Sequence, residues 1–132
     1  MNKAKYYKYM FIIGAFYNWI NSGIFFILSI IGYPYIFTIL ASSAPPTLFF
    51  LHSLLGLIAT FGIGYFIVGM NIHKNHAAVT LGIISKLWFF SLCLTYAIMG
   101  QISPLIAILG SGDCFFAILF IEFFFNYKKI KE

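Results

Sequence analysis

Four long apolar segments follow one another along the chain, and short stretches with polar residues or prolines separate them. The apolar segments cover about residues 9–31, 47–70, 77–99 and 104–125. A helix needs about 20 apolar residues to cross the hydrocarbon core of a bilayer, and each segment is long enough to do so. The pattern predicts an all-α protein in which residues 1–132 form a single transmembrane domain, an integral membrane four-helix bundle.

The stretches between the segments indicate where each helix begins and ends. The first segment follows the basic and aromatic sequence MNKAKYYKY, which is typical of an anchor at the membrane interface. It is longer than the apolar region of a signal peptide and contains Asn18 and Asn21, so we expect it to remain as a helix. Pro104 suits the first turn of the fourth helix, where its missing N–H is not needed. The uncharged connection 32–46 is expected to lie along the outer interface or to dip back into it.

Composition agrees with membrane insertion and excludes most soluble folds. Hydrophobic residues make up 62% of the 132 residues and charged residues 8%, whereas about a quarter of a soluble domain is charged. Four spans leave no room for a separate domain outside the membrane. The net charge of +5 comes from lysines at the ends of the apolar segments, which favours membrane lipids rather than nucleic acid as the partner.

The positions of the lysines predict the orientation of the helices. The lysines that flank the spans all fall on one side of the membrane, and they are Lys3, Lys5, Lys8, Lys74, Lys128, Lys129 and Lys131. The connections on the other side, 32–46 and 100–103, hold no charged residue. Positive residues in short loops remain on the cytoplasmic side. We therefore expect both termini in the cytoplasm and a multi-pass protein of a bacterial inner membrane.

Few residue patterns point to catalysis or to metal binding. Cys93 and Cys114 lie inside apolar segments without a CxxC motif, which is typical of packing residues. His52 has no second histidine at a similar depth, so a haem held by two histidines is disfavoured. The sequence also lacks an HExxH motif, a glycine-rich phosphate loop, a nucleophile elbow and a carboxylate cluster suited to a metal. These patterns predict no metal site and argue against an enzyme.

Lys86 and Asp113 are the two clearest charged residues inside the apolar segments. Each lies about ten residues into its segment, close to the middle of the membrane, where a charged group costs about 2.5–3.5 kcal/mol on the insertion scale. In the antiparallel hairpin of the third and fourth helices their axial offset is about 6 Å. This offset leaves open both a direct salt bridge and a pair bridged by an asparagine or water. Glu122 lies on the opposite face of the fourth helix, and we expect it to reach Lys128 or the lipid headgroups.

Polar and small residues on the other helices are expected to face the interior of the bundle. A stripe with steps of three and four residues on the first helix comprises Gly14, Tyr17, Asn18, Asn21 and Ser22. A face suited to close packing on the second helix comprises His52, Gly56, Thr60 and Gly64. We expect the interior to be lined by Tyr17, Asn18, Asn21, His52, Thr60, Ser85, Lys86 and Asp113. Of these, the candidate ligand-binding residues are Tyr17, Asn18, Asn21, His52, Lys86 and Asp113.

This set of polar residues has two interpretations. A buried Lys–Asp pair with asparagine hydrogen bonds could serve only to fix the register of the helices. Alternatively, ionisable residues within a membrane form a binding position for a proton, a lipid headgroup or a quinone. The sequence leaves both interpretations open.

Four short motifs give the chain a resemblance to a known family. The motifs are YN at 17–18, FGIGY at 61–65, LGIISK at 81–86 and GDCFFA at 112–117. In this order they resemble the small four-helix membrane proteins of the DoxX-like group. The resemblance implies a four-helix bundle with cytoplasmic termini that acts in or beside a membrane oxidoreductase or a quinone-linked system, and it carries over Asn18, Lys86 and Asp113. The chain has no arginine and no redox cysteine motif, which argues against a direct catalytic role.

Three functional hypotheses follow from these observations. The first is an accessory or scaffold protein that binds a lipid, a quinone or a partner subunit through its interior, the partner being another membrane protein or a second copy of the chain. The second is a small proton-coupled transporter that uses Lys86 and Asp113. The third and weakest is an intramembrane enzyme with a hydrophobic substrate and with His52 or Asp113 as acid–base group.

Overall fold

The computed structural model describes residues 2–33, 35–39, 43 and 46–130, and in this part of the chain every regular element is a helix. The elements are α1 (Lys3–Ile31), α2 (Tyr35–Ile39), α3 (Phe49–Met70), α4 (His76–Ile98), α5 (Pro104–Asn126) and the 3₁₀ turn η1 (Tyr127–Lys129). Among the described residues, four helices are long and apolar enough to cross a membrane, namely α1, α3, α4 and α5 with its extension η1. The predicted all-α fold with four long apolar helices is confirmed.

Helix α1 begins at Lys3, well before the start predicted near Tyr9. The basic lead-in is itself helical because Asn2 caps it, its Oδ1 accepting a hydrogen bond from the N–H of Ala4 at 3.2 Å. With 29 residues, α1 is about 43 Å long. The apolar segment and the lead-in therefore form one continuous helix.

The tight turn between α4 and α5 is built from the residues that the sequence indicates. Gly100 has a φ of 70°, a left-handed conformation that glycine adopts without strain. Ser103 caps α5 by accepting a hydrogen bond from the N–H of Leu105 at 3.2 Å, and Pro104 occupies the first turn. The predicted start of this helix at Pro104 is confirmed.

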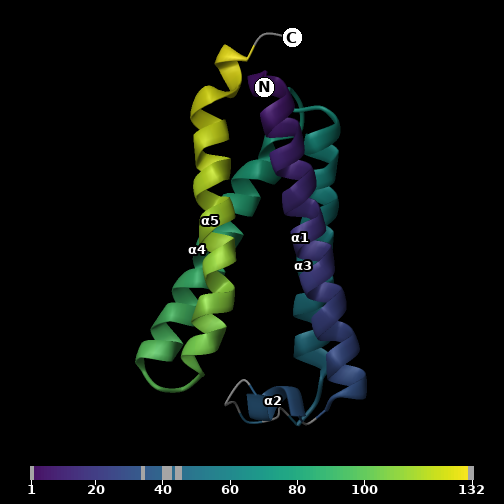
Figure 1. Ribbon diagram of the computed structural model, residues 1–132, viewed down its shortest axis with the longest axis vertical. Coiled ribbons are helices and arrows are strands. Elements are labelled where there is room, and N and C mark those ends of the chain that lie inside the picture. The colour runs from purple at the N-terminus through teal and green to yellow at the C-terminus, as the bar shows by residue number, and fades with distance from the viewer. Residues whose placement is uncertain (1, 34, 40–42, 44–45, 131–132) are drawn as a thin grey trace.

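The connection 32–46 contains the short helix α2, which lies at the end of the molecule opposite the two termini (Figure 1). The prediction for this connection falls partly on residues 34, 40–42 and 44–45, which lie outside the described residues. Helix α3 begins at Phe49, slightly after the start predicted at Thr47. The Oγ1 of Thr47 accepts a hydrogen bond from the N–H of Phe49 at 3.3 Å.

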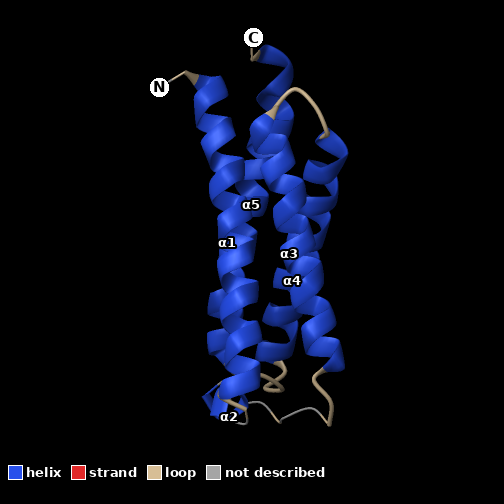
Figure 2. Ribbon diagram, turned by 90° about the vertical axis from the view of Figure 1, so that its right-hand side faces the viewer, coloured by secondary structure: helices blue, strands red, loops and turns tan. Residues whose placement is uncertain are grey.

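The long helices form two antiparallel pairs, α1 with α3 and α4 with α5 (Figure 1). Both termini lie at one end of the molecule, here called the terminal end, and α2 marks the opposite end, the α2 end. The pairs meet at the terminal end and diverge toward the α2 end, while a view turned by 90° shows all four helices along the same long axis (Figure 2). Helix α3 packs on α4, whereas α1 and α5 meet mainly through long side chains, since their backbones come close at few positions. The fold is thus two helix pairs joined mainly in one half.

Aromatic side chains fill the half in which the pairs meet. The buried cluster includes Phe11, Tyr65, Phe120 and Phe123, each 0% exposed. The ring of Phe11 lies 4.9 Å from that of Phe120 and 4.8 Å from that of Phe123. The ring of Tyr65 lies 4.8 Å from that of Phe120. Each such ring pair contributes about 0.5–1.5 kcal/mol beyond its buried area, so these contacts join α1 and α3 to α5.

The face of α3 that packs closely on α1 differs from the predicted one. A Cβ atom at Gly62 would stand 2.6 Å from Nε1 of Trp19, and one at Gly69 would stand 2.9 Å from Cγ1 of Ile12. At Gly56, by contrast, no atom lies within 4 Å, and the exposed Thr60 donates to the carbonyl of Gly56. The prediction of close packing at Gly56 and Thr60 is wrong because steps of four residues drift about 40° around a helix, whereas steps of seven keep to one face.

Candidate functional site

Lys86 of α4 and Asp113 of α5 form an ion pair inside the molecule. The Nζ of Lys86 donates a hydrogen bond to Oδ1 of Asp113. The Lys86 side chain is 4% exposed and that of Asp113 is 20% exposed. The sequence left open whether this contact is direct, and the structure has a direct pair. The two partners differ in access, since the side chain of Asp113 is partly exposed and that of Lys86 is covered.

Asn18 extends this ion pair to the other two helices. Its Oδ1 accepts a second hydrogen bond from Nζ of Lys86 at 3.2 Å, and its Nδ2 donates to the carbonyl of Ile58 at 3.0 Å. Asn18 belongs to α1 and Ile58 to α3, so one chain of hydrogen bonds runs through all four long helices. Buried polar groups that are satisfied in this way fix the relative position of helices.

Three aromatic rings surround the Lys86 ammonium. Its Nζ lies 5.6 Å from the ring centre of Tyr17, 5.5 Å from that of Tyr65 and 5.7 Å from that of Phe116. A cation at this distance is attracted to the face of an aromatic ring. We call Asn18, Lys86, Asp113 and these three rings the Lys86 cluster. Two hydrogen bonds and three rings account for the surroundings of the ammonium.

The Lys86 cluster lies where the contacts between the two helix pairs give way to contacts within each pair. The aromatic core, including Phe11 and Phe120, lies on its terminal side along each helix. Toward the α2 end, a Cβ at Gly110 of α5 would meet Sγ of Cys93 of α4 at 3.3 Å, which is a contact within one pair. Asp113, whose side chain is partly exposed, therefore lies at the boundary between the half in which the two pairs are joined and the other half.

Tyr17 brings a second polar group to the exposed side of the cluster. Its ring lies 5.0 Å from that of Phe116, and its hydroxyl lies against Gly112, where a side chain would overlap it. No hydrogen bond joins this hydroxyl to another group in the described part of the chain. Tyr17 is partly buried. The hydroxyl is thus a donor next to the residue that precedes Asp113.

Tyr65 and Phe116 belong to the cluster but were not among the predicted site residues. The Tyr65 hydroxyl is buried without a hydrogen-bond partner among the described atoms, and a Cβ at Gly82 would stand 2.7 Å from it. Ser85 lies in its neighbourhood but donates to the carbonyl of Gly82 at 3.1 Å. The sequence signal for Tyr65 was its place in the FGIGY motif. The ring contact of Phe116 with the ammonium cannot be predicted from residue spacing alone.

Two of the predicted site residues lie apart from the cluster. Asn21 is half-buried and donates from Nδ2 to the carbonyl of Tyr17 in its own helix at 2.8 Å. His52 lies toward the α2 end, where its Nε2 and the Oγ of Ser29 are 2.9 Å apart and its ring centre is 4.7 Å from that of Phe26. Because this contact joins α1 to α3, His52 serves the packing of one helix pair.

Two further residues take other positions than the sequence predicted. Thr60 is exposed and does not line the interior. Glu122 forms no ion pair with Lys128 among the described residues, and its Oε1 accepts a hydrogen bond from the hydroxyl of Tyr7 at 2.8 Å; the alternative contact with lipid headgroups stays a prediction. This contact adds a second polar link between α1 and α5 near the terminal end.

The chemistry of the Lys86 cluster is that of hydrogen bonding and charge rather than of metal binding. No group of three or more metal-ligating side chains occurs among the described residues. The cluster offers the partly exposed side chain of Asp113 and the hydroxyl of Tyr17, which lies against the neighbouring Gly112. Comparison of the chain with protein-family models, with curated proteins and with solved structures finds no significant match.

Proposed function

We propose that the chain crosses a bacterial inner membrane four times, with both termini in the cytoplasm. Four helices have the required length and hydropathy, and large apolar side chains such as Ile31, Phe50 and Phe125 are exposed on them. The described lysines other than Lys86 lie at the terminal end, on the first turns of α1, in the loop after α3 and in η1. Their gathering at one end supports this orientation.

In this orientation the Lys86 cluster lies near the middle of the membrane. Lys86 is ten residues from the start of α4 at His76, which corresponds to about 15 Å along the helix. The hydrocarbon core is about 30 Å thick, so this distance is half of it. An ion pair at this depth is costly unless it is satisfied internally, and the contacts to Asn18 and the aromatic rings supply that satisfaction.

We further propose that the protein is a non-catalytic accessory protein that binds the polar end of a hydrophobic molecule, a quinone or a lipid, beside Asp113. The observation that carries this proposal is the unequal access of the ion pair, with Lys86 covered and Asp113 partly open. The carboxylate can accept a hydrogen bond from a hydroxyl of the ligand, and the Tyr17 hydroxyl can donate one to a carbonyl oxygen. The apolar part of such a ligand would lie between the diverging helix pairs.

The family suggested by the motifs agrees with this proposal. Tyr17 and Asn18 of the first motif, Tyr65 of the second, Lys86 of the third and Asp113 of the fourth all belong to one cluster. Motifs that are far apart in the chain thus supply one set of contacts. This convergence supports membership of the DoxX-like group and a place beside a quinone-linked system.

The experiment that tests binding identifies what the purified protein carries from its native membranes. The protein is extracted in mild detergent, and bound quinones and lipids are quantified by mass spectrometry. In Tyr17→Phe, which leaves the ion pair intact, we expect bound ligand to fall by about two- to tenfold, the value of one hydrogen bond. Asp113→Asn is expected to lower the amount of bound ligand further.

Ser111→Ala is the matched control, because Ser111 is exposed on the same turn of α5 and bonds only to its own helix at Ile108. Its bound ligand should equal that of the wild type. Equal amounts of quinone or lipid in wild type, Tyr17→Phe and Asp113→Asn would contradict the proposed binding position. Proton flux in vesicles that depends on Asp113 would instead support a transporter.

A further inference from the structure

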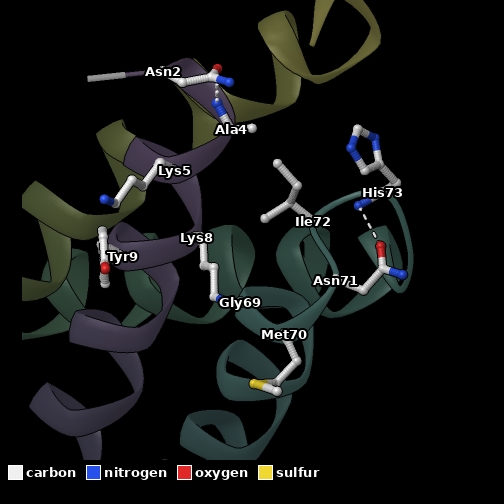
Figure 3. Close-up of a pocket in the computed structure, with 10 residues that line it drawn as sticks. All are labelled: Asn2, Ala4, Lys5, Lys8, Tyr9, Gly69, Met70, Asn71, Ile72 and His73. Atoms are coloured by element: carbon white, nitrogen blue, oxygen red, sulfur yellow. Dashed lines mark hydrogen bonds between the residues drawn. The ribbon is translucent and has the colours of Figure 1, made fainter. Parts of the chain in front are cut away.

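A separate groove lies at the terminal end, between the first turns of α1 and the loop that joins α3 to α4 (Figure 3). It has a volume of about 460 Å³ and is open to the outside. The polar residues that line it are Asn2, Lys5, Lys8, Asn71 and His73. It is distant in the fold from the Lys86 cluster, and nothing in the proposed ligand binding beside Asp113 uses it.

Close packing of α1 on α3 forms the floor of this groove. A Cβ at Gly69 would meet Ile12 at 2.9 Å and the carbonyl oxygen of Lys8 at 3.3 Å, so a larger residue would separate the helices. The side chain of Lys8 extends from α1 toward Gly69 of α3 in Figure 3. Because residue 69 is a glycine, Lys8 of α1 can lie close to the C-terminal end of α3.

The loop side of the groove is held in a fixed shape. Oδ1 of Asn71 accepts a hydrogen bond from the N–H of His73 at 3.1 Å, and the carbonyl of Asn71 accepts one from the N–H of Lys74 at 3.1 Å. These bonds use the oxygens of Asn71 and leave its Nδ2 as a donor. Asn75 closes the loop with a φ of 62°.

Among the described residues, the groove carries positive charge without a compensating carboxylate. Neither Lys5 nor Lys8 forms an ion pair within the described residues, and Nζ of Lys5 lies 5.9 Å from the ring centre of Tyr9. The two acidic side chains that the structure describes are engaged elsewhere, Asp113 with Lys86 and Glu122 with Tyr7. The complementary ligand is therefore an anion with several hydrogen-bond acceptors.

Depth in the membrane identifies the kind of anion. Lys8 precedes Asn18 by ten residues on the same helix, which places it about 15 Å from the level of the Lys86 cluster. That is half the thickness of the hydrocarbon core, so Lys8 lies at the boundary with the headgroup region, from which its long side chain can reach the lipid phosphates. This step rests on the proposed membrane orientation but not on a ligand beside Asp113. Tyr9 and Met70, which also line the groove, are exposed and apolar enough to contact acyl chains.

We propose that this groove is a binding site for the phosphate group of an anionic phospholipid on the cytoplasmic side. Lys8 donates to the phosphate oxygens, and Lys5 adds positive charge at the rim. The acyl chains lie along the exposed apolar side chains of α1 and α3.

The test measures lipid retention by the full-length protein. Purified protein in detergent is incubated with an equimolar mixture of phosphatidylglycerol and phosphatidylcholine, and bound lipid is counted by native mass spectrometry. We expect a preference for phosphatidylglycerol that falls about fivefold in Lys8→Gln, the effect of about 1 kcal/mol for one lysine near a lipid surface. Lys128→Gln removes the same charge at the same end but outside the groove, and its preference should equal that of the wild type.

Two outcomes would overturn the proposal. If Lys8→Gln and Lys128→Gln reduced the preference for phosphatidylglycerol equally, the anionic lipid would be attracted by all lysines of this end and not by the groove. Displacement of the lipid by excess inorganic phosphate would mean that the groove takes free phosphate instead. Helicity measured by circular dichroism verifies that both variants are folded.

The proposed membrane orientation is tested apart from this lipid preference. Release of the protein from native membranes by alkaline carbonate would contradict insertion itself. Retention in the carbonate-washed membrane without a preference for phosphatidylglycerol would contradict only the lipid site.

Discussion

At the scale of single residues, Lys86 shows how an ammonium is accommodated in an apolar protein. Its charge is matched by Asp113, its second hydrogen bond goes to Asn18, and aromatic rings cover the remaining directions. A buried pair of this kind adds little over well-packed apolar residues of the same volume. Loss of one partner is costly, however, because the other charge is left without compensation.

This asymmetry predicts the behaviour of two variants. Lys86→Met leaves Asp113 unpaired and is expected to lower the free energy of unfolding by about 3–5 kcal/mol. The double variant Lys86→Met with Asp113→Leu should recover most of this loss, since neither charge remains. The free energy of unfolding of the wild type and of both variants is measured in mixed detergent, with circular dichroism as the signal. A single Lys86→Met variant as stable as the wild type would show that the pair has no structural role.

The sequence identified this pair because lysine and aspartate are rare inside apolar helices, and it identified Asn18 by its similar depth. It did not identify Tyr65 or Phe116, whose contribution comes from ring faces that only the packing of helices brings to the ammonium. His52 was included by residue type, but its hydrogen bond to Ser29 belongs to another part of the molecule. The rarity of charged residues in apolar helices therefore identifies the charged residues of a site, but it does not identify the apolar and aromatic ones.

At the scale of helices, the existence of each long element follows from its hydropathy, whereas its packing face does not. Large apolar side chains are exposed on all four helices, so apolar periodicity does not distinguish the side that meets another helix from the side that is exposed. Glycine spacing was used instead, and it selected Gly56 and Gly64 where Gly62 and Gly69 make the close contacts. The helix start at Pro104 was predictable because capping depends on local residues.

Two glycines of α3 provide a direct comparison of its faces. In Gly62→Ala the new methyl group would overlap Trp19, whose Nε1 donates to the carbonyl of Ala59 at 3.0 Å. We expect a loss of about 1–3 kcal/mol in stability, as for overpacking in a core, and a change in tryptophan fluorescence. In Gly56→Ala the new methyl group has no atom within 4 Å. Tryptophan fluorescence should stay unchanged, and stability should stay unchanged or rise slightly. Equal effects of the two substitutions would contradict the assigned packing face.

At the scale of the whole molecule, the two helix pairs are joined by the packing of α3 on α4 and by three further kinds of contact, which lie in the terminal half or at its boundary. These are the aromatic core, the hydrogen bond from Tyr7 to Glu122 and the Lys86 cluster. The sequence predicted a four-helix bundle from four long apolar segments, but this pattern does not determine the angle between the pairs. The divergence follows from where large aromatic side chains are placed, which depends on packing between distant segments.

This arrangement predicts that the distance between the pairs varies more at the α2 end than at the terminal end. Spin labels are attached to exposed positions in a background in which Cys93 and Cys114 are replaced, and distances are measured by pulsed electron paramagnetic resonance. One pair of labels at Ile30 and Ile108 reports on the α2 end, and a second at Tyr9 and Phe125 reports on the terminal end. We expect a broad distance distribution for the first and a narrow one for the second, because the packed aromatic rings restrict only the terminal half.

Adding Lys86→Met and Asp113→Leu removes the polar link at the boundary and should broaden the distribution between Ile30 and Ile108 further, while that between Tyr9 and Phe125 stays narrow. Distributions of equal width at both ends would show that the pairs move as one rigid body, and the space beside Asp113 would then have a fixed size.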